Sequence, residues 1–297
     1  MSAQKEQITI LWFKRDLRIE DHPAICHAVQ LGFPILPLYV VEPALWMQSD
    51  YGGRQWEFTK ECLFDLRAQL GALGMPLVVR IDAVRKVLSE LATTFDVKHL
   101  VAHEETGTAW TFQRDLQVQA WCRESAIDFT ELPQSGVVRR LGTRDHWARA
   151  RDRFVDGARL KSPKALKPID IDIGHIPDWA DISGEPDRCP LRQHGGRRAA
   201  LASLDKFWGN GIKTYRWAMS SPVTAPDACS RISPHLALGV MSIREVAQLS
   251  ALRSKSFSTP AKKGYASFQS RLAWRDHFIQ KLEDQPDLDQ VAMHRAY

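Results

Sequence analysis

The chain has 297 residues, of which 44% are hydrophobic and 25% are charged, and its net charge is +5 with a pI near 9.0. This length suits two domains better than one, and the apolar content is sufficient for a buried core. No apolar run approaches the ~18 residues of a membrane span, and the first residues lack the layout of a signal peptide, so we expect no membrane association and a cytoplasmic location. The positive charge is compatible with a polyanionic partner but does not specify one.

The five cysteines are scattered and form no C-x-x-C pair: Cys26, Cys62, Cys122, Cys189 and Cys229. This spacing favours reduced, structural thiols, and it predicts no metal site. The ten tryptophans admit two interpretations, packing in the core or stacking on a flat ligand such as a flavin or a base.

The first part of the chain alternates short apolar runs with longer amphipathic stretches. Strands are expected at 8–13, 34–41, 76–80, 100–103 and 129–132, with helices at 54–73, 82–93 and 109–124. Strands that alternate with helices predict a doubly wound parallel sheet, the Rossmann-like α/β class, over residues 1–135. Neither G-x-G-x-x-G nor a P-loop motif occurs, so the sheet does not match a standard dinucleotide or P-loop site.

Beyond this region the strand pattern stops. Residues 136–196 are rich in Pro, Gly and charge, which indicates a connector between domains. Helical periodicity returns at 197–297, with further helices expected at 242–252 and 262–282, so the second domain is predicted to be all-helical.

Three segments carry residues that suit ligand binding. The first, LWFKRDLRIEDHPAI, places Lys14, Arg15, Asp16, Arg18 and Asp21 between a strand and a helix for which Asp21 is the expected N-cap. Loops at the carboxyl ends of parallel strands commonly hold ligands. The alternative is that these charges form an ion-pair network that braces the loop.

The second segment surrounds the expected start of a helix at Pro234. It contains Cys229, Ser230, Arg231, Ile232 and Ser233, called the 229–233 segment below. Hydroxyls, an arginine and free N–H groups at a helix N-terminus can hold a phosphate, but the same residues can simply cap the helix.

The third segment is FQSRLAWRDHF. On a helix, Phe268, Arg271, Arg275 and Phe278 are spaced to share one face. Arginines beside aromatic rings suit a flat anionic ligand, whereas the alternative is a solvated arginine stripe.

Together these segments resemble the photolyase/cryptochrome family, and they occur in the family's order. The opening WFKRDLRIEDHPAI is similar to its first strand and loop, and Arg54, Phe58, Leu66 and the pair Arg114 and Asp115 fit later helices. The stretches GGRRAALASLDKFWGNGIKTYRWAMSSP, CSRISPHLALGVMSIREV and FQSRLAWRDHF are similar to the start of its flavin domain. The resemblance implies that the chain stops before that domain is complete.

The resemblance implies a set of binding residues. FAD would contact Tyr215, Cys229, Ser230, Arg231, Ile232, Ser233, Phe268 and Arg275. DNA would contact Arg271, Trp274, Arg275 and Phe278. An antenna chromophore, a deazaflavin or a folate, is a further cofactor that the resemblance allows. No catalytic residue is assigned.

Three positions depart from the family pattern. Cys229 stands where Thr is common, and Met219 stands where several members have an Arg that contacts DNA. Arg271 replaces a Glu that contacts the lesion in pyrimidine-dimer photolyases, so the charge is reversed.

The function implied by the resemblance is light-driven repair of pyrimidine lesions by a DNA photolyase, a carbon–carbon lyase, in the full-length protein. The expected partner is DNA with such lesions, or single-stranded DNA. A chain that ends here is expected to hold FAD weakly and to be inactive in repair. The alternatives are a cryptochrome-type photoreceptor that signals through a partner without repair, and an α/β ligand-binding domain with an incompletely folded helical tail.

Overall fold

The computed structural model describes residues 5–183, 187, 189–292 and 296, and the chain forms two compact units. Unit 1 comprises Met1–Leu132 and Leu160–Gly196, and unit 2 comprises Pro133–Arg159 and Arg197–Tyr297. The segment expected to connect two domains is therefore divided between them. Within the described part of the chain, every helix of membrane-spanning length is too polar to lie in a bilayer.

Unit 1 is built on a five-stranded sheet in which all neighbouring strands are parallel, with the order β3-β2-β1-β4-β5. The strands are β1 (Gln7–Phe13), β2 (Ile35–Val41), β3 (Val78–Ile81), β4 (Asp96–His103) and β5 (Asp128–Leu132). All of β2 and nearly all of β1 is buried, as expected for central strands covered on both faces. The predicted α/β class is confirmed.

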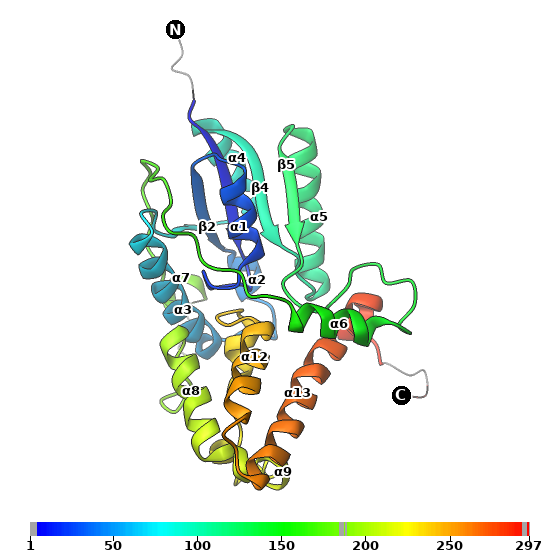
Figure 1. Cartoon of the computed structure of the whole chain (residues 1–297). Coiled ribbons are helices and arrows are strands. Elements are labelled where there is room, and N and C mark those ends of the chain that lie inside the picture. The colour runs from blue at the N-terminus through cyan, green and yellow to red at the C-terminus, as the bar shows by residue number, and fades with distance from the viewer. Residues whose placement is uncertain (1–4, 184–186, 188, 293–295, 297) are drawn as a thin grey trace. The chain divides into compact units, whose positions relative to one another are not determined.

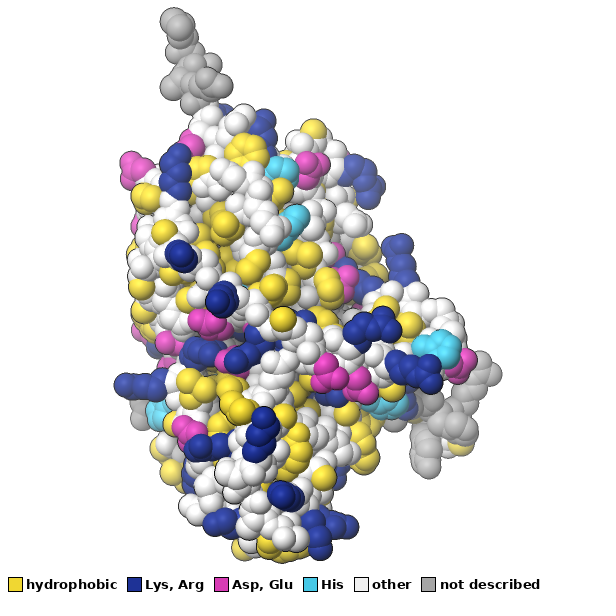
Figure 2. Space-filling view, in the orientation of Figure 1, with side chains coloured by type: hydrophobic (Ala, Val, Ile, Leu, Met, Phe, Trp, Pro, Cys, Tyr) yellow, Lys and Arg dark blue, Asp and Glu magenta, His cyan; other side chains and the backbone are white. Residues whose placement is uncertain are grey.

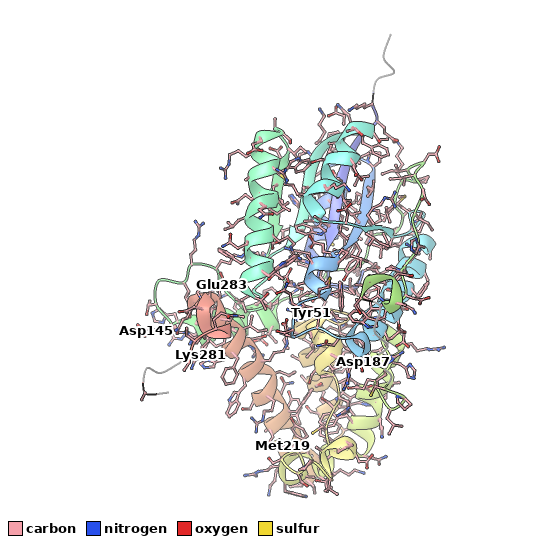
Figure 3. The ribbon with its side chains drawn as sticks, turned by 180° about the vertical axis from the view of Figure 1, so that it is seen from behind. Tyr51, Asp145, Asp187, Met219, Lys281 and Glu283 are labelled. Atoms are coloured by element: carbon pink, nitrogen blue, oxygen red, sulfur yellow. The ribbon has the colours of Figure 1, made fainter. Side chains whose placement is uncertain are left out.

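The connecting helices lie on both faces of this sheet. They are α1 (Pro23–Gln30), α2 (Pro43–Trp46), α3 (Gly53–Ala72), α4 (Val84–Thr94) and α5 (Ala109–Glu124). Helix α1 lies against β1 and β4, whereas α4 and α5 contact one another on the opposite face (Figures 1 and 3). The chain after β1 therefore leaves in one direction and the chain after β4 in the other, which creates a topological switch point between these two strands.

The start of α1 differs from the prediction. His22, not Asp21, is the N-cap, because its ring Nδ1 accepts a hydrogen bond from the N–H of Ile25 at 3.0 Å. Asp21 instead has a φ of +48°, and its carboxylate accepts from the N–H of Leu160 at 3.1 Å. A short polar residue tolerates this left-handed conformation better than most.

Residues 160–196, the return segment, run back along unit 1 and include the short helix α7 (Trp179–Ile182). The N–H of Val79 donates to the carbonyl of Ile173 at 2.8 Å, so the return segment covers part of the edge strand β3. Ion pairs attach it to α3, among them Arg192 with Glu61 at 2.7 Å and Arg54 with Asp187 at 3.1 Å. A region without regular structure is thus fixed by contacts to distant residues.

The regular structure among the described residues of unit 2 is all helical, as predicted for 197–297. Its elements are α6 (Trp147–Asp156), α8 (Arg197–Gly209), η1 (Gly211–Lys213), α9 (Tyr215–Ala218), α10 (Ala225–Ala228), α11 (Ser233–Ala237), α12 (Ile243–Ser254), α13 (Thr259–Asp284) and η2 (Pro286–Asp289). The reading of this region as an incompletely folded tail is not supported, because most of these helices carry buried side chains.

One stripe of α13 contacts the other elements of unit 2 in turn. Gly264, Phe268, Leu272, Asp276 and Gln280 follow each other at intervals of four residues, and all are buried. A Cβ on Gly264 would lie 1.9 Å from the carbonyl oxygen of Ile212 in η1, so only glycine permits this approach. At the other end, the amide of Gln280 bonds both the N–H and the carbonyl of Val138, at 2.7 and 3.0 Å. The helix α13 therefore organises the core of unit 2.

Candidate functional site

The carboxyl edge of the sheet in unit 1 holds a buried network of charges around two cations. Lys14 donates to Asp115 at 2.7 Å and lies 3.5 Å from Glu131. Arg114 pairs with Glu105 at 2.7 Å and with Glu42 at 3.3 Å.

Lys14 and Arg114 also lie over the ring of Trp12, at 4.7 and 5.0 Å from its centre. Burial alone would raise the pKa of Glu105, but the charges of Arg114 and Lys14 lower it. Lys14 is thus part of an ion-pair network that braces the loop after β1. This is the alternative to ligand binding that the sequence left open for this segment. Removing one partner of such a network leaves a buried charge unpaired, which is strongly destabilising.

A second buried cluster lies at the switch point and joins Asp16, His22 and His103. The carboxylate Oδ2 of Asp16 is 2.7 Å from Nδ1 of His103 and 3.1 Å from Nε2 of His22. The other carboxylate oxygen accepts the N–H of Lys14 at 2.7 Å. All three side chains are at most 1% exposed. These hydrogen bonds keep the pKa of Asp16 well below its usual value despite burial, whereas burial lowers the pKa of His103 to about 3.

Three such ligand atoms within 4.8 Å could hold a metal ion, but the backbone argues against it. The N–H of Ile25 donates to Nδ1 of His22, and the N–H of Ala24 donates to Nε2 of His103 at 3.2 Å. Each ring must therefore be unprotonated on that side and carry its hydrogen on the nitrogen that faces Asp16. A metal ion there would require both rings to lose their only proton, so the donor set fits a buried carboxylate and not a metal.

Three polar groups near this edge make no hydrogen bond to any residue in the described ranges: the guanidinium of Arg15 and the hydroxyls of Tyr39 and Tyr51. Tyr39 is 8% exposed. The charges of Arg15 and Arg114 lower the pKa of Tyr51, and the charge of Arg114 lowers that of Tyr39, against the larger effect of burial. Burial raises the pKa of both phenols, which keeps them protonated as hydrogen-bond donors. Tyr51 lies close to the lower end of the strands in Figure 3.

In unit 2, three aromatic rings pack together in a cluster. One of them belongs to Tyr215, for which the resemblance implies contact with FAD. The rings of Phe207, Tyr215 and Phe268 lie 4.9 to 6.2 Å apart, and each side chain is nearly buried. Burial raises the pKa of Tyr215, and the positive charge of Arg271 opposes this rise. The fold therefore brings the ring of Tyr215 against that of Phe268, 53 positions downstream.

The 229–233 segment leads into α11, which has only five residues and begins at Ser233. Its N-cap is Ile232, with no side-chain cap, so the capping role considered for the serines is not observed. Ser230 is buried and accepts the N–H of Ile232 at 3.5 Å, and Arg231 has a φ of +56°. Arg231 and Ser233 are exposed. The segment itself contains no acidic side chain, which suits an anionic ligand.

The third segment is split between core and solvent. Phe268 is 2% exposed, whereas Trp274 and Phe278 are 51% and 53% exposed. Arg271 lies over the Trp274 ring at 4.4 Å, so a cation and two rings are presented together on α13. Met219 lies at one end of unit 2, and Lys281 and Glu283 lie at the other (Figure 3).

Arg275 is engaged inside unit 2. Its guanidinium donates to Asp276 at 3.2 Å and to the carbonyl of Leu236 at 3.0 Å. Asp276 and the His22–His103 pair were not singled out from the sequence. Asp276 lies four positions after the apolar Leu272 but four before the polar Gln280, so the local pattern marked neither Asp276 nor its partner.

Comparisons with known proteins agree with this architecture. Residues 9–145 match the model of the DNA photolyase family. The cryptochrome DASH of Gloeobacter violaceus is 26% identical over 91% of this chain and 58% of its own length. The class III photolyase from Agrobacterium tumefaciens has a TM-score of 0.78 at 22% identity, covering 97% of this chain and 61% of that one. An archaeal photolyase from Sulfolobus tokodaii, solved with two FAD molecules, has a TM-score of 0.74 at 20% identity, covering 98% and 63%.

These matches show the class of fold: a parallel α/β unit together with a helical unit, as in the solved photolyases named above. Residues 9–145 are thus similar to the DNA photolyase family, and the chain as a whole is similar to cryptochrome DASH and photolyase proteins. It spans about three-fifths of the length of the relatives named above.

Proposed function

We propose that unit 2 binds FAD and that the protein is a photolyase-like flavoprotein acting on pyrimidine lesions in DNA. The observation that carries the proposal is the packing of the Tyr215 ring against Phe268 of α13, 6.2 Å apart, one helical turn before Arg271. These are positions at which the family resemblance implies flavin and DNA contacts, and they are widely separated in the chain.

The residues of this chain suit the two ends of such a ligand. The hydroxyls of Ser230 and Ser233 and the guanidinium of Arg231 are donors for phosphate oxygens, and Ile232 is buried beneath them. Because α11 is short, its dipole contributes little, and side chains must supply most of the binding. Tyr215 and Phe268 supply an apolar wall. The chemistry that FAD supplies when bound in such proteins is light-driven electron transfer.

DNA is the proposed partner of the exposed side of α13. Trp274 and Phe278 offer ring faces for stacking on unpaired bases, and Arg271 adds a charge next to the first ring. Basic side chains are also spread over the surface of unit 2 that Figure 2 shows. The basic side chains suit DNA phosphates in general, whereas the exposed rings favour a flipped or single-stranded base over an intact duplex.

A cryptochrome-type photoreceptor without repair activity is the second candidate. Arg271 favours it, because a cation occupies the position where dimer photolyases carry a carboxylate that contacts the lesion. A repair assay of the FAD-loaded protein under blue light, with oligonucleotides that contain defined pyrimidine lesions, separates the two. Restored bases support the photolyase function, whereas lesions that persist while the flavin is photoreduced support the photoreceptor.

For an antenna chromophore, deazaflavin or folate, we propose the carboxyl edge of unit 1. The guanidinium of Arg15 and the hydroxyls of Tyr39 and Tyr51 support this location, because they can donate hydrogen bonds to a ligand. Open α/β sheets hold ligands at this edge. The buried carboxylates Glu42, Glu105 and Asp115 nearby disfavour a phosphate-bearing molecule.

FAD titration tests the main proposal directly. We expect saturable quenching of FAD fluorescence by the purified protein, and about tenfold weaker binding for Arg231→Gln, the usual effect of losing one charge-assisted hydrogen bond. Arg253→Gln is the matched control, because it removes an exposed arginine of α12 outside the site. Equal affinity in all three proteins, or no binding at millimolar FAD, contradicts the proposal.

A further inference from the structure

A chain of polar contacts crosses the interior of unit 2 from α6 to α11. Nε of Arg151 in α6 donates to Asp276 in α13 at 3.0 Å. The second oxygen of Asp276 accepts from Arg275 at 3.2 Å, and the other end of that guanidinium donates to the carbonyl of Leu236 in α11 at 3.0 Å. Asp276 is 0% exposed and Arg151 is 8% exposed.

This chain ends on the helix that follows the 229–233 segment. A helix of five residues is not stable alone, because nucleation is costly and few bonds repay it. α11 also follows Arg231, whose backbone is in the left-handed region, and it ends near Gly239 with a φ of +62°. Both flanks therefore lack regular structure, and the position of α11 depends on contacts with α13.

Arg275 provides such a contact in a form that lysine cannot reproduce. Its planar guanidinium reaches two acceptors in different directions at once, the Asp276 carboxylate and the Leu236 carbonyl. Asp276 in turn is fixed by Arg151, so the direction of the Arg275 fork is set from a third helix. Only 29% of the Arg275 side chain is exposed.

We propose that Arg275 is a positioning residue that holds α11, and with it the 229–233 segment, in place, and that it is not itself a contact for FAD phosphate or DNA. Asp276 and Arg151 orient it. The consequence for ligand binding rests on the proposed FAD function, whereas the consequence for α11 does not.

The substitution Arg275→Lys distinguishes the role of Arg275 in holding α11 from the role of its positive charge. Lysine keeps the positive charge that a direct phosphate contact would use but cannot bridge both acceptors. We expect about tenfold faster amide exchange at Leu236, Leu238 and Val240, measured by hydrogen–deuterium exchange, with unchanged exchange in α8. Asp276→Asn should produce the same local pattern, because it frees Arg275 from its orientation. Arg271→Lys is the matched control on the same helix, and it should leave exchange in α11 unchanged.

The double variant of Arg275→Lys and Asp276→Asn should be no worse for α11 than the worse single variant, since both break one chain of contacts. If exchange in α11 stays at the wild-type rate in Arg275→Lys, the proposal is wrong. If Asp276→Asn unfolds all of unit 2, amide exchange rises in α8 as well. In that case the exchange rates of Arg275→Lys alone decide whether Arg275 holds α11 in place.

FAD titration of the same proteins is the second measurement, and it gives their affinity for FAD. Binding weakened about tenfold by Arg275→Lys, in parallel with faster exchange in α11, supports positioning. A wild-type protein that binds no FAD contradicts the proposed function, while the exchange result still decides the role of Arg275. Faster amide exchange in α11 with unchanged FAD affinity would show that the position of α11 does not affect FAD binding.

Discussion

Nδ1 of His103 donates to Oδ2 of Asp16 over 2.7 Å, and each of these side chains is 1% exposed. The residues lie 87 positions apart, at the ends of neighbouring strands β1 and β4. Because the second nitrogen of His103 accepts a backbone N–H, the ring is neutral and its orientation is fixed. The pair therefore joins the loop after β1 to the strand across the switch point without using a net charge on the histidine.

Replacing the carboxylate of this cluster should destabilise unit 1 strongly. Both carboxylate oxygens of Asp16 accept hydrogen bonds from N–H groups. In the Asp16→Asn variant an NH₂ group replaces one of these oxygens, so two donors would face each other. We expect a loss of about 3 kcal/mol in the free energy of unfolding, as for other broken buried polar networks. Urea denaturation measures it. Asp128→Asn is the control, because Asp128 pairs with His99 at 3.6 Å on the surface and should matter by less than about 0.5 kcal/mol. Similar losses for both variants would contradict the prediction.

Acid should destabilise unit 1 through His103 well before the carboxylates titrate. Burial lowers the pKa of His103 to about 3, so the unfolded chain binds a proton more readily from about pH 6.5 downward. Stability is therefore complete above this range and falls as the pH drops toward 3, by about 1.4 kcal/mol per pH unit for one such group. His103→Asn keeps a donor for Asp16 but cannot titrate, so its stability should depend less steeply on pH between 6 and 4. An unchanged slope would show that His103 is not neutral in the folded protein.

Added metal ions should not stabilise the cluster of Asp16, His22 and His103. Backbone N–H groups occupy the outer nitrogens of both rings, so the inner nitrogens carry hydrogens. We expect the melting temperature to be the same with zinc, with nickel and with a chelator. A rise in melting temperature upon metal addition that is abolished by His22→Asn would refute this reasoning.

Gly264 should tolerate no side chain. A Cβ there would lie 1.9 Å from the carbonyl oxygen of Ile212, and that atom is backbone, so η1 must move away from α13. We expect Gly264→Ala to cost about 3 kcal/mol or to lose the fold of unit 2. Gly209→Ala is the matched control, because nothing lies within 4 Å of that Cβ and alanine favours helix. Circular dichroism during thermal unfolding distinguishes the two, and equal stability would contradict the packing.

The sequence by itself determined most of the elements, although it placed α6 (Trp147–Asp156) within the expected connector. Hydrophobic periodicity is a local property, and it predicted the bounds of α5 to the residue and all five strands to within a few positions. The family resemblance, which depends on the order of motifs along the chain, also singled out Tyr215 and the 229–233 segment, and their role in binding stays a prediction.

The tertiary structure decided which of these residues meet. Asp16 could be recognised as a loop charge, but its enclosure by His22 and His103 follows from the strand order, which places β4 beside β1. Spacing alone put Phe268 and Phe278 on one face of α13, yet one is buried and the other is half exposed, because the neighbouring helices cover only part of that face. Likewise, Arg275 suited a ligand by its type, and only the packing of α6 and α11 against α13 supplied its partners. Periodicity depends on residues a few positions apart, whereas these contacts join residues dozens of positions apart and exist only once the chain is folded.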